Sequence, residues 1–167
     1  MCKGVMMSFE SQLGDFLAGC KKLIVLGVGN ELKCDDGVGP FIIKKLKEEG
    51  IENKKELLFI NAETVPENFT GKIRKEKPTH VIIVDACLMG GQPGDIKIVN
   101  KDDFANIGIS THSMSLSFFV RYLEKGTDFG IIFIGIEPES MDYSEKLTEN
   151  VEKTAYEFID ILKGIIL

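Results

Sequence analysis

Residues 22–28 read Lys-Leu-Ile-Val-Leu-Gly-Val, and this almost continuous apolar run is the stretch that decides the fold. Such a run is typical of a strand buried on both faces of a parallel sheet. Two similar runs, residues 80–84 (His-Val-Ile-Ile-Val) and 130–136 (Gly-Ile-Ile-Phe-Ile-Gly-Ile), predict two more core strands. We expect the strands at 23–28, 80–84 and 130–136 to be neighbours and to run mainly parallel.

The segments around these strands carry the rest of the secondary structure. Residues 57–60 predict another strand, and residues 94–99 alternate polar and apolar residues as a half-exposed edge strand does. Apolar residues at helical spacing predict helices over 8–20, 37–49, 66–75, 113–125 and 144–163. The alternation predicts an α/β fold, a three-layer α/β/α sandwich with a mostly parallel twisted sheet. The 167 residues fit one domain, 1–167, with residues 1–21 as an N-terminal helical extension.

Composition and charge argue against several classes of function. The formal net charge is -6, and basic residues are interleaved with acidic ones, so no concentrated basic face is expected for nucleic acid. No apolar run approaches the roughly 20 residues that span a bilayer, and the N-terminus is too polar for a signal peptide. The four cysteines are too widely spaced for a Cys-x-x-Cys site. We therefore expect a cytoplasmic monomer that binds neither nucleic acid nor membrane.

Candidate functional residues follow the ends of the predicted strands, where ligand sites of such sheets lie. The loop after the first strand holds Asp35 and Asp36, and the strand at 80–84 leads directly into Asp85. Helix capping would explain either acid of the first loop, but a charge directly after a fully apolar strand is seldom there for packing. His112 stands just before a predicted helix, whose dipole favours the neutral, metal-ligating imidazole. Two carboxylates and this imidazole predict a divalent metal site, for nickel or zinc, or an acid/base site.

Other interpretations of the same loops are weaker. Gly27 and Gly29 suggest a dinucleotide site, but the third glycine would fall at Leu32, and two acids at the helix start would repel a pyrophosphate. A nucleophilic serine is disfavoured because the Gly-x-Ser-x-Gly pattern is absent. Cys34 and Cys87 are interpreted as small buried residues. His80, at the start of its strand, is interpreted as structural.

The succession of these segments resembles the hydrogenase maturation endopeptidases, particularly those that process the large subunit of hydrogenase 3. The order and spacing of short segments between residues 23 and about 162 carry the resemblance: 27–30 (Gly-Val-Gly-Asn), 35–40 (Asp-Asp-Gly-Val-Gly-Pro), 65–68 (Val-Pro-Glu-Asn), 83–86 (Ile-Val-Asp-Ala), 89–90, 93–96, 111–114 (Thr-His-Ser-Met) and 135–138 (Gly-Ile-Glu-Pro). One departure is residues 61–64 (Asn-Ala-Glu-Thr), where the family commonly has a glycine-rich stretch. Glycine there would allow a backbone conformation that Ala62 and Glu63 resist.

The resemblance implies an α/β/α protease that removes the C-terminal extension from the nickel-loaded large-subunit precursor of a nickel-iron hydrogenase. It implies that Asp36, Asp85 and His112 bind nickel, that Asp36 and Asp85 serve catalysis, and that the substrate precursor supplies the nickel. The ion could be a recognition device or a Lewis acid, and a metal-free alternative makes one carboxylate a general base for water. Two rival functions are a non-catalytic nickel-binding maturation factor and a nucleotide or small-ligand binding protein.

Overall fold

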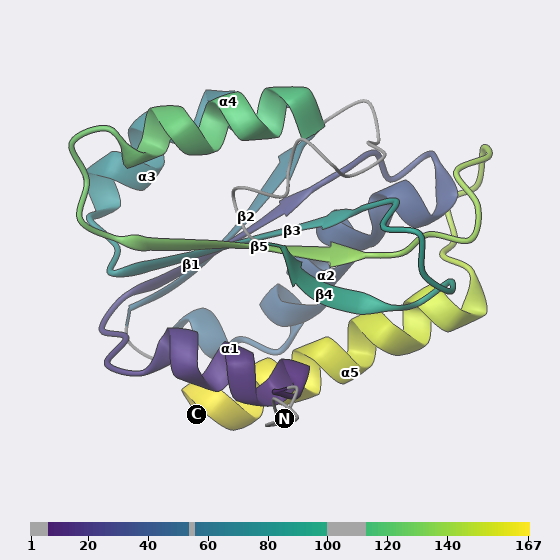
Figure 1. Cartoon of the computed structure of the whole chain (residues 1–167), viewed down its shortest axis with the longest axis horizontal. Helices are drawn as coiled ribbons and strands as arrows, with labels where there is room; N and C mark the ends of the chain where they lie inside the picture. Colours follow the sequence, from purple (N-terminus) through teal and green to yellow (C-terminus); the bar gives the residue numbers. More distant parts are fainter. Residues whose placement is uncertain (1–6, 54–55, 100–112) are drawn as a thin grey trace, which may run out of the picture.

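The computed structural model describes residues 7–53, 56–99 and 113–167, and it is an α/β/α sandwich (Figure 1). The five strands of its central sheet stand in the order β2-β1-β3-β5-β4. Their bounds are Leu23–Val28 (β1), Leu57–Glu63 (β2), His80–Ala86 (β3), Ile96–Val99 (β4) and Gly130–Ile136 (β5). All neighbours are parallel except β4, which pairs antiparallel with β5 at the edge. The predicted fold class and the predicted adjacency of β1, β3 and β5 are confirmed.

Helices cover both faces of the sheet, which explains why the central strands carry apolar residues on both of their faces. One face packs against α1 (Phe9–Leu17), α2 (Val38–Glu48) and α5 (Glu149–Ile166), and the other against α3 (Thr70–Glu76) and α4 (Ser113–Glu124) (Figure 1). Successive residues of β1 divide between the two cores: Leu23 and Val25 join the first, Ile24 and Leu26 the second. All six residues of β1 are buried. None of the described helices combines the length and apolarity that crossing a bilayer requires.

The structure differs from the predicted elements mainly at their ends. The helix predicted over 66–75 is a 3-10 turn, η3 (Pro66–Phe69), followed by α3, and the helix predicted over 37–49 is preceded by a second turn, η1 (Cys34–Gly37). The strand predicted to end at residue 60 continues to Glu63. The last helix was predicted from residue 144 but begins at Glu149, because residues 139–148 form a loop bound to η1.

The segment 61–64 adopts the conformation for which glycine is usually needed. The β1–β2 register shifts between Gly27 and Val28, and Glu63 has a left-handed φ of 50°. Two hydrogen bonds hold this irregular stretch of β2. The Asn61 side chain accepts a hydrogen bond from the Glu63 N–H (3.0 Å), and the Glu63 carbonyl accepts one from the Gly29 N–H (2.8 Å). The expected resistance of Glu63 to this backbone is therefore overcome by hydrogen bonds, at a cost of about 1 kcal/mol.

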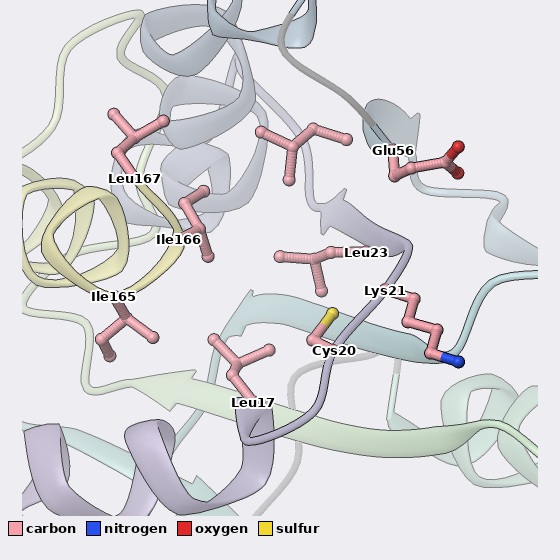
Figure 2. A pocket seen from close by; sticks show the side chains of 9 residues that line it. Leu17, Cys20, Lys21, Leu23, Glu56, Ile165, Ile166 and Leu167 are labelled. Atoms are coloured by element: carbon pink, nitrogen blue, oxygen red, sulfur yellow. The ribbon is translucent and has the colours of Figure 1, made fainter.

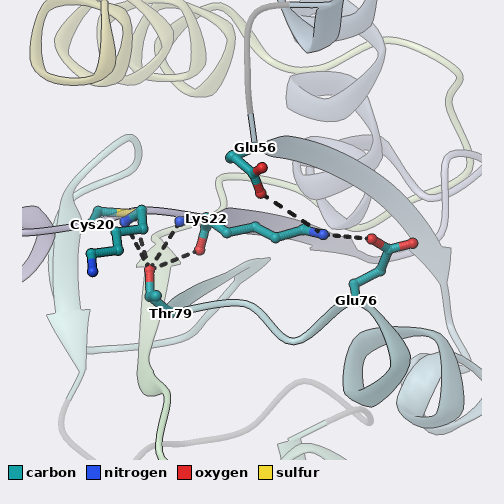
Figure 3. Close-up of polar contacts among 6 residues, drawn as sticks. Cys20, Lys22, Glu56, Glu76 and Thr79 are labelled. Carbon is teal, nitrogen blue, oxygen red and sulfur yellow. Dashed lines mark hydrogen bonds and ion pairs between the residues drawn. The ribbon is translucent and has the colours of Figure 1, made fainter.

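The edge at which the parallel strands begin is closed by mutually bonded polar groups (Figure 3). The Thr79 hydroxyl accepts from the N–H groups of Lys21 and Lys22, both at 3.0 Å, and donates to the Lys22 carbonyl. The Lys22 ammonium lies 2.7 Å from the Glu76 carboxylate and 4.0 Å from that of Glu56. These contacts tie the start of β1 to the segment between α3 and β3. We call this edge the entry edge, and the opposite edge, where β1, β2, β3 and β5 end, the exit edge.

Candidate active site

Close backbone packing at the exit edge brings the first turn of α2 onto the ends of β1 and β3. A Cβ atom on Gly39 would stand 2.4 Å from the carbonyl oxygen of Val28 and 2.6 Å from that of Val84. Any larger residue would force the helix away from the sheet. Gly27 of β1, whose added Cβ would lie 2.4 Å from the Gly39 carbonyl oxygen, and Gly39 of α2 therefore allow this helix-on-strand contact, which places η1 beside the residue that follows Val84.

That residue is Asp85, whose side chain is only 1% exposed. Burial raises the pKa of Asp85 well above its ordinary value, the negative charge of Asp36 raises it further, and the Ala86 N–H acts in the opposite direction. Among the described residues, no donor forms a hydrogen bond of normal geometry with either carboxylate oxygen of Asp85. A buried carboxylate without such bonds is costly to fold. Asp36 and Asp85 are thus two buried acids whose charges interact, and their predicted roles in metal binding and catalysis stay predictions.

Asp36 reaches this position from η1. Its side chain is buried, and one carboxylate oxygen accepts a hydrogen bond of 3.1 Å from the backbone N–H of Asn30. A Cβ atom on Gly29 would lie 1.8 Å from the Asp36 carbonyl oxygen, so this turn admits glycine alone. Asp36 is thus fixed by the loop that leaves β1, and Asp85 by the strand β3 itself.

The neighbouring acid, Asp35, has a different role. Its side chain is fully buried, and its carboxylate accepts four hydrogen bonds of 2.7–3.0 Å: from the backbone N–H groups of Glu139, Ser140 and Thr148 and from the Thr148 hydroxyl. These bonds fasten the loop of residues 139–148 to η1. Asp35 is therefore a structural anchor, which separates it from Asp36 as a candidate site residue.

Glu137 is a buried acid at this edge that the sequence analysis did not select. It follows β5 directly, and its carboxylate accepts a 2.6 Å hydrogen bond from the Met89 N–H. It thereby fixes the loop that leaves β3, four residues after Asp85. The reasoning that selected Asp85, a charged residue directly after an apolar strand, applies equally to Glu137 and could have identified it.

The thiols near the acids are not activated. Cys34 and Cys87 are buried, as predicted. Burial, the Asp85 charge and the Glu137 charge raise the pKa of Cys87 to about 12, and burial with the Asp35 charge raises the pKa of Cys34. A nucleophilic cysteine needs a lowered pKa, because the thiolate is the reactive form. Covalent catalysis by either thiol is therefore disfavoured, in agreement with the sequence analysis.

The third predicted metal ligand, His112, lies outside the described residues, so its position relative to the two acids stays a prediction. Within the described ranges, no three His, Cys, Asp or Glu side chains gather closely enough to hold a metal ion. Asp36 and Asp85 could supply two carboxylate ligands, and a borderline divalent ion bound there would need donors from elsewhere. His80 stands at the entry edge, with its ring edge-on to Phe16 and its Nδ1 2.9 Å from the Thr79 hydroxyl, as the structural interpretation expects.

Two sizeable cavities lie away from the acids. One, of about 390 Å³, is at the entry edge between α1, β1 and the end of α5, where Leu17, Cys20 and Ile166 surround it (Figure 2). The other, of about 450 Å³, lies between η3, α3 and α4, against Phe118 and Tyr122. Neither contains Asp36 or Asp85. The chemistry of the carboxylates, and not cavity size, therefore identifies the candidate site.

Comparison with known proteins identifies the family. A model of the hydrogenase maturation protease family matches residues 40–164. The hydrogenase 3 maturation protease of Escherichia coli is 33% identical, over 84% of this chain and 90% of that protein. A Methanocaldococcus jannaschii protein, provisionally named as such a protease, is 40% identical over 95% of this chain and 98% of its own length.

Solved structures agree. The crystal structure of the [NiFe] hydrogenase maturation protease HycI from Thermococcus kodakarensis aligns with a TM-score of 0.82 and 30% identity, covering 93% of this chain and 99% of that one. The solution structure of the E. coli endopeptidase HycI gives a TM-score of 0.74 and 29% identity, over 86% of this chain and 90% of that one. The strand order, the paired acids at the exit edge and these relatives lead to one conclusion: the chain belongs to the hydrogenase maturation protease family and is an endopeptidase.

Proposed function

We propose that this endopeptidase removes the C-terminal extension from the large-subunit precursor of a nickel-iron hydrogenase after nickel has been inserted. The observation that carries the proposal is the pair of buried acids, Asp36 and Asp85, at the exit edge. The Asp85 carboxylate accepts no hydrogen bond of normal geometry from the described residues. Burial and the charge of Asp36 disfavour the charged form of Asp85, and a divalent cation bound by the two carboxylates would offset that repulsion.

In this proposal nickel belongs to the substrate and is not a resident cofactor. Asp36, Asp85 and His112 add their ligands to an ion that the precursor already holds, so only a nickel-loaded precursor is recognised. Carboxylate and imidazole donors suit a borderline divalent ion. Burial of both acids supports the proposal further, because ion–carboxylate attraction is strongest where water is excluded.

The protonation of Asp85 beside Asp36 is consistent with binding of a nickel-loaded precursor. The raised pKa of Asp85 means that the empty site retains a proton more readily than an ordinary carboxyl group. An arriving cation opposes that shift and favours release of the proton. With the ion bound, a carboxylate oxygen that does not ligate it can accept a proton from the water that attacks the scissile carbonyl carbon and return that proton to the departing amine as the C–N bond breaks. Asn30, whose N–H bonds Asp36, holds one of the two acids in place throughout.

Mass spectrometry of a large-subunit precursor before and after incubation tests the proposal. Wild-type protein should shorten the nickel-loaded precursor by its C-terminal tail and leave the nickel-free precursor intact. Asp36→Asn and Asp85→Asn should slow cleavage by at least about 100-fold, because each replaces an anionic ligand by a neutral amide of the same shape.

The matched control is Asp160→Asn, which changes an exposed acid on α5 and should cleave normally. Normal cleavage by both site variants would reject the assignment of Asp36 and Asp85. Equal cleavage of nickel-free and nickel-loaded precursor would reject the role of nickel. Binding of nickel-loaded precursor without any cleavage by the wild type would favour a non-catalytic maturation factor.

A further inference from the structure

Exposed apolar side chains stand on either side of the two acids along the chain. Leu32, four residues before Asp36, is 52% exposed, and Leu88, three residues after Asp85, is 44% exposed. Tyr143, in the loop that Asp35 anchors, is 86% exposed. Exposed apolar side chains that gather on one surface mark interaction sites. Leu32 lies in the loop after β1, Leu88 in the loop after β3 and Tyr143 in the loop after β5. All three loops leave the exit edge.

Leu32 and Tyr143 belong to two paired backbone segments. Lys33 and Ser144 form a parallel bridge, in which the Ser144 N–H bonds the Leu32 carbonyl at 3.1 Å and the Cys34 N–H bonds the Ser144 carbonyl at 2.8 Å. Leu32 and Tyr143 each immediately precede a bridge residue, so this backbone pairing brings the two loops side by side at these residues.

The backbone beneath the three side chains is fixed. The Leu32 N–H bonds the Asn30 side chain at 2.9 Å, while the Leu32 carbonyl is held by Ser144. On either side of Leu88, the Cys87 N–H bonds the Ile136 carbonyl at 2.9 Å and the Met89 N–H bonds Glu137. Side chains presented on such a fixed backbone lose little loop entropy when a partner binds.

We propose that Leu32, Leu88 and Tyr143 form the substrate platform: an apolar surface that binds apolar side chains of the precursor polypeptide next to the bond that is cut. An endopeptidase must hold its polypeptide substrate against its catalytic groups, and these three side chains come from loops that leave the same edge of the sheet as the acids. The choice of the large-subunit precursor as the occupant rests on the proposed function. Leu32, Leu88 and Tyr143 are thus specificity-determining residues that take no part in the chemistry.

Equilibrium binding of a purified large-subunit precursor to the immobilised full-length protein tests the platform. Leu32→Ser, Leu88→Ser and Tyr143→Ser should each raise Kd by about 5–10-fold, and the triple variant by more than about 100-fold, as expected for anchors of an interface. Leu167→Ser removes an exposed apolar side chain after the end of α5, at the entry edge, and should bind like the wild type. Leu32→Met, Leu88→Met and Tyr143→Phe keep the apolar surface and should retain binding.

Cleavage by the same variants separates this inference from the proposed function. In precursor processing the serine variants should raise KM and leave kcat within about twofold of the wild type, because they weaken binding without touching the acids. A triple serine variant that binds precursor as tightly as the wild type overturns the platform, and so does a wild-type protein that binds no precursor. If the wild type binds but does not cleave, the proposed function fails and the binding series still decides on the platform.

Discussion

The entry and exit edges of the sheet differ in how their charged side chains are paired, and the pKa of a carboxyl group shifts in opposite directions at the two edges. At the entry edge, the Lys22 ammonium faces the carboxylate of Glu76, and Thr79 completes the backbone bonds around it (Figure 3). The hydrogen bond from Lys22 lowers the pKa of Glu76, so the charged form is favoured there. At the exit edge, Asp85 is buried next to another acid, and its pKa moves in the other direction. Opposite charges are paired at the entry edge, whereas at the exit edge the negative charge of a neighbouring acid disfavours the charged form of Asp85.

This contrast recurs within the exit edge between adjacent residues. Asp35 and Asp36 are both buried, yet Asp35 accepts four hydrogen bonds that hold a loop, whereas the negative charge of Asp36 raises the pKa of Asp85. Buried carboxylates are stabilising when fully bonded and destabilising when placed beside a like charge. Substitutions of Asp35 and Asp85 should therefore change the free energy of unfolding in opposite directions.

The largest effect on stability should come from Asp35→Ala. Loss of the carboxylate leaves the backbone N–H groups of Glu139, Ser140 and Thr148 without their acceptor, so we expect the free energy of unfolding to fall by roughly 3–5 kcal/mol. Urea denaturation measures this directly. Asp142→Ala, which removes an exposed acid from the same loop, should change stability by less than about 0.5 kcal/mol. Similar values for the two variants would show that Asp35 is not the anchor of the loop.

An effect of opposite sign is expected for Asp85→Asn in the metal-free protein. The folded-state pKa of Asp85 is raised, so its proton stabilises the native state below the unfolded-state pKa of about 3.9, and this stabilisation is lost as pH rises through the folded-state pKa. The amide stays neutral throughout. The variant should therefore be more stable than the wild type by about 1–2 kcal/mol at neutral pH.

Thermal or urea unfolding of both proteins from pH 4 to pH 8 checks the sign. The stability advantage of Asp85→Asn should grow as pH rises and shrink towards acid. A constant difference across this range would mean that Asp85 does not titrate with a raised pKa. A variant less stable than the wild type at neutral pH would remove the contrast between the edges.

A smaller loss is expected at the entry edge from Thr79→Val, which keeps the shape of the side chain but removes its hydroxyl. The N–H groups of Lys21 and Lys22 lose their acceptor, and stability should fall by about 1–2 kcal/mol. Precursor cleavage, measured well below the melting temperature, should be unchanged because this edge is remote from the acids. Slower cleavage by a folded Thr79→Val protein would contradict the division between a stabilising edge and a functional one.

The sequence predicts the sheet well because burial on both faces leaves a strong signal. The apolar runs of β1, β3 and β5 need no information from distant residues, and their parallel adjacency is confirmed. The start of α5 could not be predicted in the same way. Residues 144–148 carry helix-start signals, but Asp35, more than a hundred residues earlier, takes the Thr148 N–H and hydroxyl and holds this stretch as a loop.

The sequence predicts that acids gather at the strand ends, but it does not show which acid of the first loop belongs to the candidate site. Strand ends lead to Asp85, but two adjacent acids in one loop look alike in sequence, and only their hydrogen bonds separate Asp35 from Asp36. Glu63 shows a second limit. Residue preference favours glycine at a left-handed position, but local bonds from Asn61 and to Gly29 outweigh a cost of about 1 kcal/mol. The role of His112 remains a prediction from its place before α4.

The contact of Gly39 with β1 and β3 has a consequence for protein engineering. Main-chain atoms on both sides fill the space around this residue, and the Cβ of Gly27 would in turn lie 2.4 Å from the Gly39 carbonyl oxygen. The distance between the two acids therefore depends on this close backbone contact, and a larger residue at Gly27 or Gly39 would displace α2. A mutant library that tests the proposed cation site should diversify Asp36 and Asp85 and leave both glycines unchanged.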